Sequence, residues 1–181
     1  MSQASNQVQW CLNKAKKEIE ECEKENKRIK HRGLLQDEPG IDNAKKHLKK
    51  AERNLKAITD FKKIGYSDWS VTAAFYSIYQ CFLAIASKFG YESRNQQCTI
   101  ALMRTLNEED KIELEERFIE MLEYEEDKDQ EESTIGLREE YTYGIKVSIE
   151  DEKINTLLKD CQDAVDVAKE IVFSQDGQKG L

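Results

Sequence analysis

The amino-acid sequence predicts an all-α fold, an up-and-down helical bundle of four to five core helices with an extra N-terminal heptad helix. Residues 69–89 hold fifteen apolar side chains in twenty-one positions and a single charge, Lys88. A helix this apolar must be covered on all sides. Charged residues make up 35% of the chain and Pro39 is its only proline, a composition that suits long helices. Apolar residues at steps of three and four recur on both sides of the run, as in amphipathic helices.

The 181 residues suffice for one domain with an appendage. We expect an N-terminal heptad helix within residues 1–33, a helical bundle over 42–173 and a disordered tail over 174–181. The clearest break is GLLQDEPG, residues 33–40, which holds the only proline and two glycines.

The first predicted helix runs from Ser5 to Lys30 and stops near Gly33. Alternating steps of four and three predict a heptad seam with a polar Asn in it, formed by Val8, Leu12, Ala15, Ile19, Cys22, Asn26 and Ile29. The partner helix could lie within the domain or on a second copy, and the sequence leaves both open.

The second predicted helix runs from Asp42 to Lys62, with one apolar stripe and one strongly basic side. The basic side carries Lys45, Lys46, Lys49, Lys50, Arg53 and Lys56. Residues 1–66 have a net charge of +6 and the remainder −14. Such asymmetry indicates either a surface that binds phosphates or two oppositely charged solvated surfaces.

The third predicted helix is the apolar run, capped by Ser67 or Asp68 and ended by Gly90. Its polar residues favour burial among helices over a lipid environment. Small and polar side chains form a stripe that another helix could approach closely, made of Ser70, Ala73, Ser77, Gln80, Ala84 and Ser87.

The remaining elements are a short apolar helix over 99–106, a helix opened by Asn107 as its N-cap, and a last helix opened by a capping box of Ser148 and Asp151. Between them, residues 123–132 are too acidic to pack and predict a mobile loop.

No motif for a cofactor or a metal is found, and we expect neither. The five cysteines are scattered and never in C-x-x-C spacing, which predicts reduced thiols rather than a disulfide framework or a zinc site. His31 and His47 lie in lysine-rich polar surroundings and are expected on the surface. No apolar stretch follows Met1, so we expect no signal peptide, a cytoplasmic location and no membrane association.

The segment YSDWSVTAAFYSIYQCFLAIASKFGYESRN resembles the core of the HEPN superfamily of archaeal and bacterial helical proteins. The matching residues are Asp68, Trp69, Val71, Ala73, Ala74, Phe75, Tyr76, Tyr79, Gly90 and Tyr91. The resemblance covers about residues 42–172. It implies a helical bundle that is usually a homodimer, often encoded beside a minimal nucleotidyltransferase. Many such proteins are metal-independent ribonucleases, toxins among them, and others bind only nucleotide or a partner.

Active HEPN proteins carry R-x4-6-H at the start of the last helix. Here Arg138 matches the arginine, but Tyr143 stands in place of the histidine. A phenol has a pKa of about 10 and is a poor general base at neutral pH. The other candidates are Arg94, which is followed by Cys98 rather than a histidine, and Gln80, at a position where relatives often carry histidine.

These observations favour a non-catalytic domain that binds RNA, a nucleotide or a partner protein, with Arg138, Tyr143, Arg94 and Gln80 as candidate ligand-binding residues. One alternative is a HEPN ribonuclease with a degenerate site, and another is a purely structural helical dimer. The stripe of small residues and the heptad seam together predict a homodimer.

Overall fold

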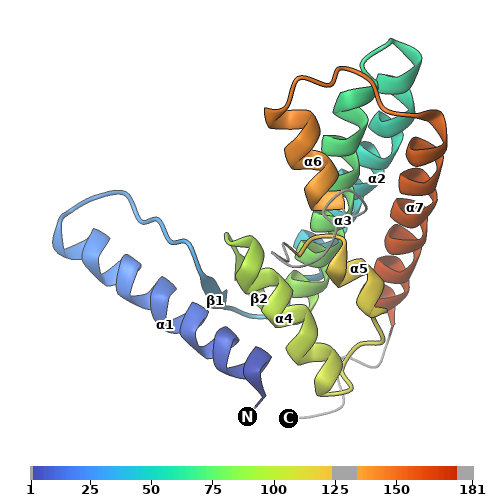
Figure 1. The fold of residues 1–181 in the computed structure, drawn as a ribbon. Helices are drawn as coiled ribbons and strands as arrows, with labels where there is room; N and C mark the ends of the chain where they lie inside the picture. The colour runs from blue at the N-terminus through green and yellow to red at the C-terminus, as the bar shows by residue number, and fades with distance from the viewer. Residues whose placement is uncertain (1, 124–133, 175–181) are drawn as a thin grey trace.

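A computed structural model describes residues 2–123 and 134–174. It confirms the all-α bundle and adds one small antiparallel sheet (Figure 1). In chain order the elements are α1 (Gln3–Lys24), β1 (Leu34–Gln36), α2 (Ile41–Lys63), α3 (Ser67–Lys88), β2 (Tyr91–Ser93), α4 (Gln96–Glu108), α5 (Glu116–Glu120), α6 (Thr134–Tyr143) and α7 (Asp151–Phe173). The expected tail and all of the acidic stretch after Glu123 up to residue 132 lie outside the described residues, apart from Ser174.

Helix α3 is the centre of the bundle, packed against α2, α4, α6 and α7. By length and composition it is the one described helix that could cross a membrane, and 78% of its apolar window is buried inside the protein. The predicted cap is wrong. Tyr66 is the N-cap, and Ser67 is already helical, with its Oγ accepting a hydrogen bond from the Ile149 N–H at 3.1 Å. Gly90 follows the C-cap with φ +76°, as the sequence predicts.

The stripe of small residues on α3 lies under α2, which confirms that a helix approaches it closely. Ser70 Oγ donates to the Ile58 carbonyl at 2.8 Å, and Ser77 Oγ donates to the Ala51 carbonyl at 3.0 Å. Each hydroxyl is fully buried and satisfied by the facing backbone. The stripe is therefore used within the chain and is not open to a second copy.

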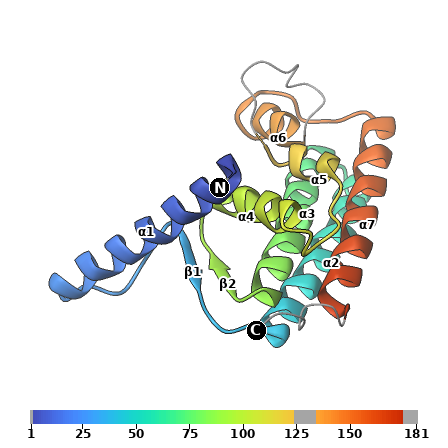
Figure 2. The same ribbon diagram turned by 90° about the horizontal axis from the view of Figure 1, so that it is seen from below.

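Helix α1 forms an arm that projects from the bundle (Figures 1 and 2). Its buried face packs on α4 and β1 within the chain and consists of Ala4, Val8, Cys11 and Ala15. The expected end at Lys30 is wrong, because Asn26 adopts a left-handed conformation with φ +55° and the Lys27 N–H bonds the Cys22 carbonyl. This is the Schellman arrangement that ends helices, and asparagine tolerates it. Ile29, the last seam residue, is 55% exposed.

Two short strands join the arm to the bundle and were not expected. Leu34 pairs with Ser93, Leu35 with Glu92 and Gln36 with Tyr91 in an antiparallel register. Three residues are too few for a period-2 pattern to be recognised.

A disulfide between Cys11 and Cys98 joins α1 to α4, contrary to the expectation of five reduced thiols. Both cysteines are fully buried and their Cα atoms lie 5.9 Å apart, although 87 positions separate them in sequence. Cys22, Cys81 and Cys161 are free. The spacing of the cysteines in sequence does not predict this disulfide, because only the packing of α1 on α4 brings the two residues together.

Two further expectations about local structure are wrong. Asn107 is not an N-cap but lies inside α4, where its side chain bonds both the N–H and the carbonyl of Leu114. Ser148 does not cap α7. The N-cap residue is Glu150, and its side chain makes no capping hydrogen bond. In both cases the residue type and spacing fit a cap, but the helix boundary lies at a different residue.

Candidate nucleic-acid interface

Arg138 and Tyr143, the residues at the two positions compared with the HEPN motif, point in different directions from α6. Arg138 lies on α6 with its guanidinium carbon 4.4 Å from the centre of the buried Phe75 ring, a cation–π contact. Tyr143 is the last residue of α6 and is 78% exposed. At about 100° per residue, five positions put the two side chains about 140° apart around the helix. Within one chain, Arg138 and Tyr143 therefore cannot both face the same substrate atom.

Gln80 is buried on the α2 side of α3, where its Oε1 lies 2.7 Å from Nδ1 of His47. Since an amide oxygen only accepts, Nδ1 of His47 is the donor in this contact. His47 was expected on the surface but is half-buried by this contact. A histidine therefore does contact Gln80, but it comes from α2 rather than from α3 itself. The sequence feature that could have indicated its burial is the position of His47 next to Leu48, which belongs to the apolar stripe of that helix.

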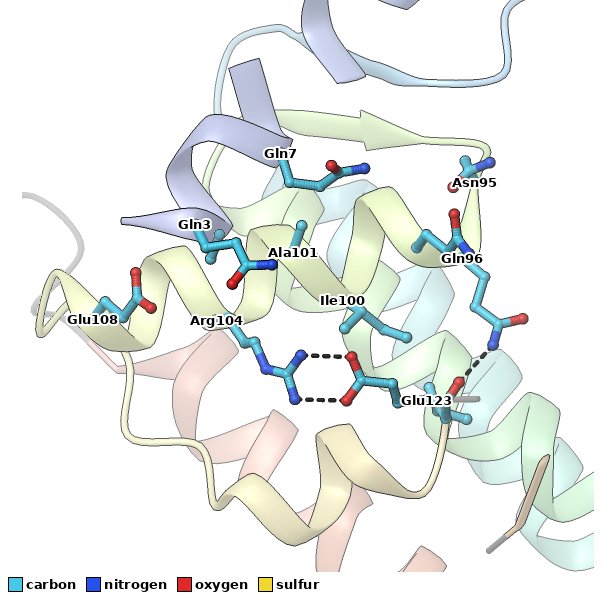
Figure 3. A pocket seen from close by; sticks show the side chains of 12 residues that line it. Gln3, Gln7, Asn95, Gln96, Ile100, Ala101, Arg104, Glu108 and Glu123 are labelled. Carbon is cyan, nitrogen blue, oxygen red and sulfur yellow. Dashed lines mark hydrogen bonds and ion pairs between the residues drawn. The ribbon is translucent and has the colours of Figure 1, made fainter. Parts of the chain in front are cut away.

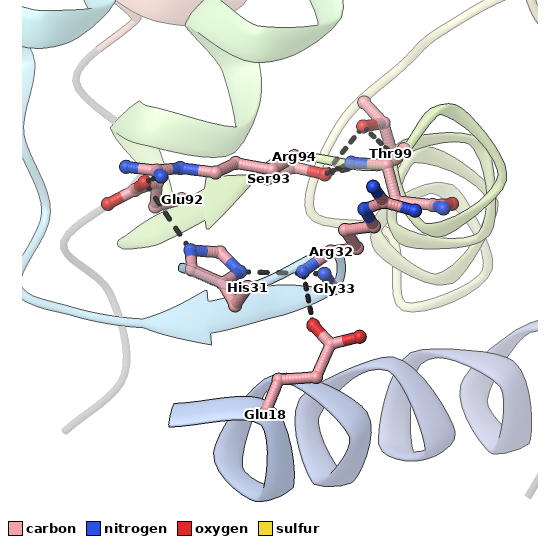
Figure 4. A network of polar contacts seen from close by, with 9 residues as sticks. Glu18, His31, Arg32, Gly33, Glu92, Ser93, Arg94 and Thr99 are labelled. Carbon is pink, nitrogen blue, oxygen red and sulfur yellow. Dashed lines mark hydrogen bonds and ion pairs between the residues drawn. The ribbon is translucent and has the colours of Figure 1, made fainter. Parts of the chain in front are cut away.

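Arg94 follows β2 and forms a salt bridge with Glu92, with Nε of Arg94 2.6 Å from Oε1 of Glu92 (Figure 4). The same carboxylate oxygen lies 3.5 Å from Nε2 of His31. His31 was predicted on the surface but is only 5% exposed, because the segment returning from the arm carries it under β2 (Figure 4). Apart from this 3.5 Å ion-pair contact, Nε2 of His31 has no hydrogen-bond partner among the described residues.

Arg94 and His47 line one hollow of about 400 Å³ at the start of α2. Its walls also carry Asp37, Glu38 and Glu92, so the single arginine is outnumbered by carboxylates. This mixed charge does not suit a phosphate. Over the part of the chain that the structure describes, no group of three His, Cys, Asp or Glu side chains is placed to hold a metal ion.

A second hollow, of about 720 Å³, lies between the first turns of α1 and helix α4 (Figure 3). Its one arginine, Arg104, is held by Glu123 through two bonds of 2.6 Å and by Glu116. The hydrogen bonding that Arg104 donates to Glu123 is the largest cause that raises the pKa of Arg104 above its ordinary value. The remaining polar lining consists of Gln and Asn amides and the carboxylate of Glu108, so the hollow offers no cation for a phosphate other than the paired Arg104.

The free buried thiols are not nucleophiles. Burial raises the pKa of Cys81 to about 12, and burial likewise raises the pKa of Cys161. Both sulfurs therefore stay protonated at neutral pH, and a thiol rather than a thiolate is inert.

The exposed side of α2 carries the largest run of cations in the sequence, and we call it the basic track: Lys45, Lys46, Lys49, Lys50, Arg53 and Lys56. Among the described residues only Lys56 has a carboxylate partner, Asp60 at 3.5 Å. Arg104 and Arg117, by contrast, each bind at least two carboxylates. From Lys45 to Lys56 the track covers about 16 Å at 1.5 Å per residue.

The basic track ends at a hollow of about 240 Å³ with an aromatic wall. Arg53 and Lys56 line this hollow together with Phe61 and Ile64, and so does Asp60, the partner of Lys56. The Phe61 ring lies 6.3 Å from the ring of Trp69, which is 54% exposed. Charge and aromatic surface therefore adjoin at this point, and the four residues predicted from the sequence lie elsewhere.

No protein-family model matches the chain, and no curated protein matches it in a sequence search. The resemblance to the HEPN superfamily therefore stays a prediction.

Proposed function

We propose that the protein is a non-catalytic helical module that binds single-stranded RNA along the basic track of α2. The observation that carries the proposal is the row of six cations, of which only Lys56 is paired with an acidic side chain among the described residues. Unpaired lysines and arginines can each neutralise a phosphate and release a counterion on binding. The overall charge of −8 does not oppose this, because the net negative charge lies after residue 66.

A single strand is favoured over a duplex because of the aromatic wall at the end of the track. Unstacked bases gain about 1–3 kcal/mol each when they stack on an aromatic ring, whereas bases inside a duplex cannot reach one. Phe61 lines the same hollow as Arg53 and Lys56, and the Trp69 ring lies 6.3 Å from the Phe61 ring, so a base could stack here while its phosphate is bound. The length of the track, about 16 Å, suits a few nucleotides.

Binding without cleavage is favoured by the geometry of the predicted catalytic residues. Arg138 is stacked on Phe75, and Tyr143 points away from it. His47, the half-buried histidine of α2, is held by Gln80 on the side of the helix away from the track. General acid–base catalysis is worth about 10²–10⁴-fold and requires a titrating group within reach of the 2′-hydroxyl.

The proposal is tested with a fluorescently labelled oligouridylate and anisotropy measured over a range of salt concentrations. In the triple variant Lys45→Gln, Lys49→Gln, Arg53→Gln, we expect weaker binding and a shallower dependence on salt. Each lost phosphate contact on a single strand lowers the slope of log K against log salt by about 0.7, so the slope should fall by up to about 2.

The matched control is Lys16→Gln, Lys17→Gln, Lys24→Gln on the arm, which changes the net charge equally at exposed positions. It should leave both affinity and slope unchanged. Equal weakening by both triple variants would contradict a specific track. Metal-independent cleavage by the wild type that disappears in Arg138→Ala would instead support the ribonuclease alternative. A nucleotidyltransferase partner is implied only by the HEPN resemblance and stays a prediction.

A further inference from the structure

Hydrogen-bonding groups without partners gather in the hollow of about 720 Å³ between α1 and α4 (Figure 3). The side-chain amides of Gln3, Gln7 and Gln97 line it and make no hydrogen bond among the described residues. Each amide carries donors on its nitrogen and an acceptor on its oxygen. Ile100 and Ala101, which also line the hollow, are buried and apolar. The hollow therefore has the size of a ligand site, about 300–1,000 Å³, and the usual combination of an apolar floor with a few polar groups.

The two walls of the hollow are fixed to each other. Gln7 lies one helical turn before Cys11 in α1, and Gln97 directly precedes Cys98 in α4, so the disulfide between these cysteines joins the walls beside the free amides. The start of α4 is fixed in turn by Asn95, whose Oδ1 accepts a hydrogen bond from the Cys98 N–H at 3.0 Å. A site whose walls are held in place loses little conformational entropy when a ligand binds.

The α4 wall is long and straight. Gln97, Ala101, Arg104 and Glu108 line the hollow at steps of four, three and four residues, which places them on one face of the helix. From Gln97 to Glu108 this face extends for about 16 Å at 1.5 Å per residue. An extended chain rises about 3.3 Å per residue, so the wall matches a segment of about five residues.

The charges and side-chain types of the lining exclude several kinds of ligand. Arg104 is already bound by Glu123 and Glu116, so no free cation is offered to a phosphate. The residues that line the hollow include no aromatic side chain, and a nucleobase or a sugar ring therefore finds no surface on which to stack. Glu108 is the one lining charge without a partner among the described residues, and it lies at the far end of the α4 wall.

We propose that this hollow binds an extended, uncharged peptide segment of a partner protein. We call the site the amide groove, and its residues are Gln3, Gln7, Gln97, Ile100 and Ala101. The main chain of an extended segment presents free N–H and C=O groups, and one glutamine amide can donate to the second and accept from the first. A helical partner has already paired these groups within itself. Glu108 favours a basic side chain at one end of the segment and repels an acidic one.

Selection from a phage-displayed library of short random peptides, with the disulfide-bonded full chain as bait, tests the proposal. The best peptide is synthesised with blocked ends and titrated by calorimetry. In Gln7→Ala, Gln97→Ala we expect binding about tenfold weaker, because neutral hydrogen bonds are lost. The matched control is Gln9→Ala, Gln162→Ala, which removes two exposed amides outside the groove and should leave the affinity unchanged. Alanine favours a helix, so both variants should fold, and a thermal melt checks this.

Four outcomes would overturn the proposal. One is that the wild type enriches no peptide over an albumin bait. Another is equal affinity of the selected peptide for Gln7→Ala, Gln97→Ala and for the control variant. The third is selection of acidic peptides, which Glu108 should repel. The fourth is a loss of oligouridylate binding in Gln7→Ala, Gln97→Ala, which would assign the groove to RNA. Peptide binding should persist in the triple variant of the basic track, so failure of either proposal leaves the other standing.

Discussion

Removing the Cys11–Cys98 bridge should lower the free energy of unfolding by about 2–5 kcal/mol. The bridge closes a loop with a sequence separation of 87 and therefore restricts the unfolded chain strongly. Among the described residues it is the one disulfide, and it links the arm to α4 in addition to the continuous chain. The double variant Cys11→Ala, Cys98→Ala is compared with the wild type by urea denaturation, with Cys22→Ala as the control for loss of a partly exposed free thiol.

Thiol counting gives an independent measurement of the same bond. The wild type, purified without reductant and denatured, should expose three reactive thiols, those of Cys22, Cys81 and Cys161. After reduction all five cysteines should react. Five reactive thiols before reduction, with an unfolding free energy equal to that of the double alanine variant, would mean that the bridge does not form in solution.

Gly90→Ala should destabilise the protein far more than Gly65→Ala, although both glycines have positive φ values, +76° and +84°. A left-handed conformation costs an alanine about 1–2 kcal/mol at either position. Around Gly65 a new Cβ would meet nothing within 4 Å, whereas at Gly90 it would lie 2.4 Å from the Asp37 carbonyl oxygen. That oxygen belongs to the backbone, so the loop must shift at a further cost of about 1–3 kcal/mol.

Urea denaturation of both glycine variants measures this difference. Gly65→Ala supplies the cost of the backbone conformation alone, so the excess in Gly90→Ala reports the close approach of the β1–α2 connection to the end of α3. Equal unfolding free energies for the two variants would mean that this approach does not occur in solution.

The helices with a continuous pattern could be predicted from the sequence. The apolar run of residues 69–89 and the stripe with a basic opposite side both became helices, α3 at Ser67–Lys88 and α2 at Ile41–Lys63. Periodicity works here because each helix spans several turns and buries one face throughout. The stripe of small residues correctly indicated a close helix neighbour, which is α2.

The ends of helices were predicted less well because they depend on single residues. Asn26 ends α1 by adopting a left-handed conformation, although it fits the heptad spacing. Ser67 and Asn107 were predicted as caps from their type, yet each bonds a distant backbone group instead, Ile149 and Leu114 respectively. A cap forms only where the chain actually turns, which spacing alone does not reveal.

By itself, the sequence determined the helical class, the long core helices and the cation row of α2, because composition and periodicity are local properties. Only the tertiary structure decided what meets across the chain: Cys11 with Cys98, His47 with Gln80, and Leu34–Gln36 with Tyr91–Ser93. It also stacked Arg138 on Phe75 while leaving Tyr143 exposed at the end of α6. These contacts join residues far apart in sequence or fix the direction of a side chain, and both follow from how the helices pack rather than from any one segment.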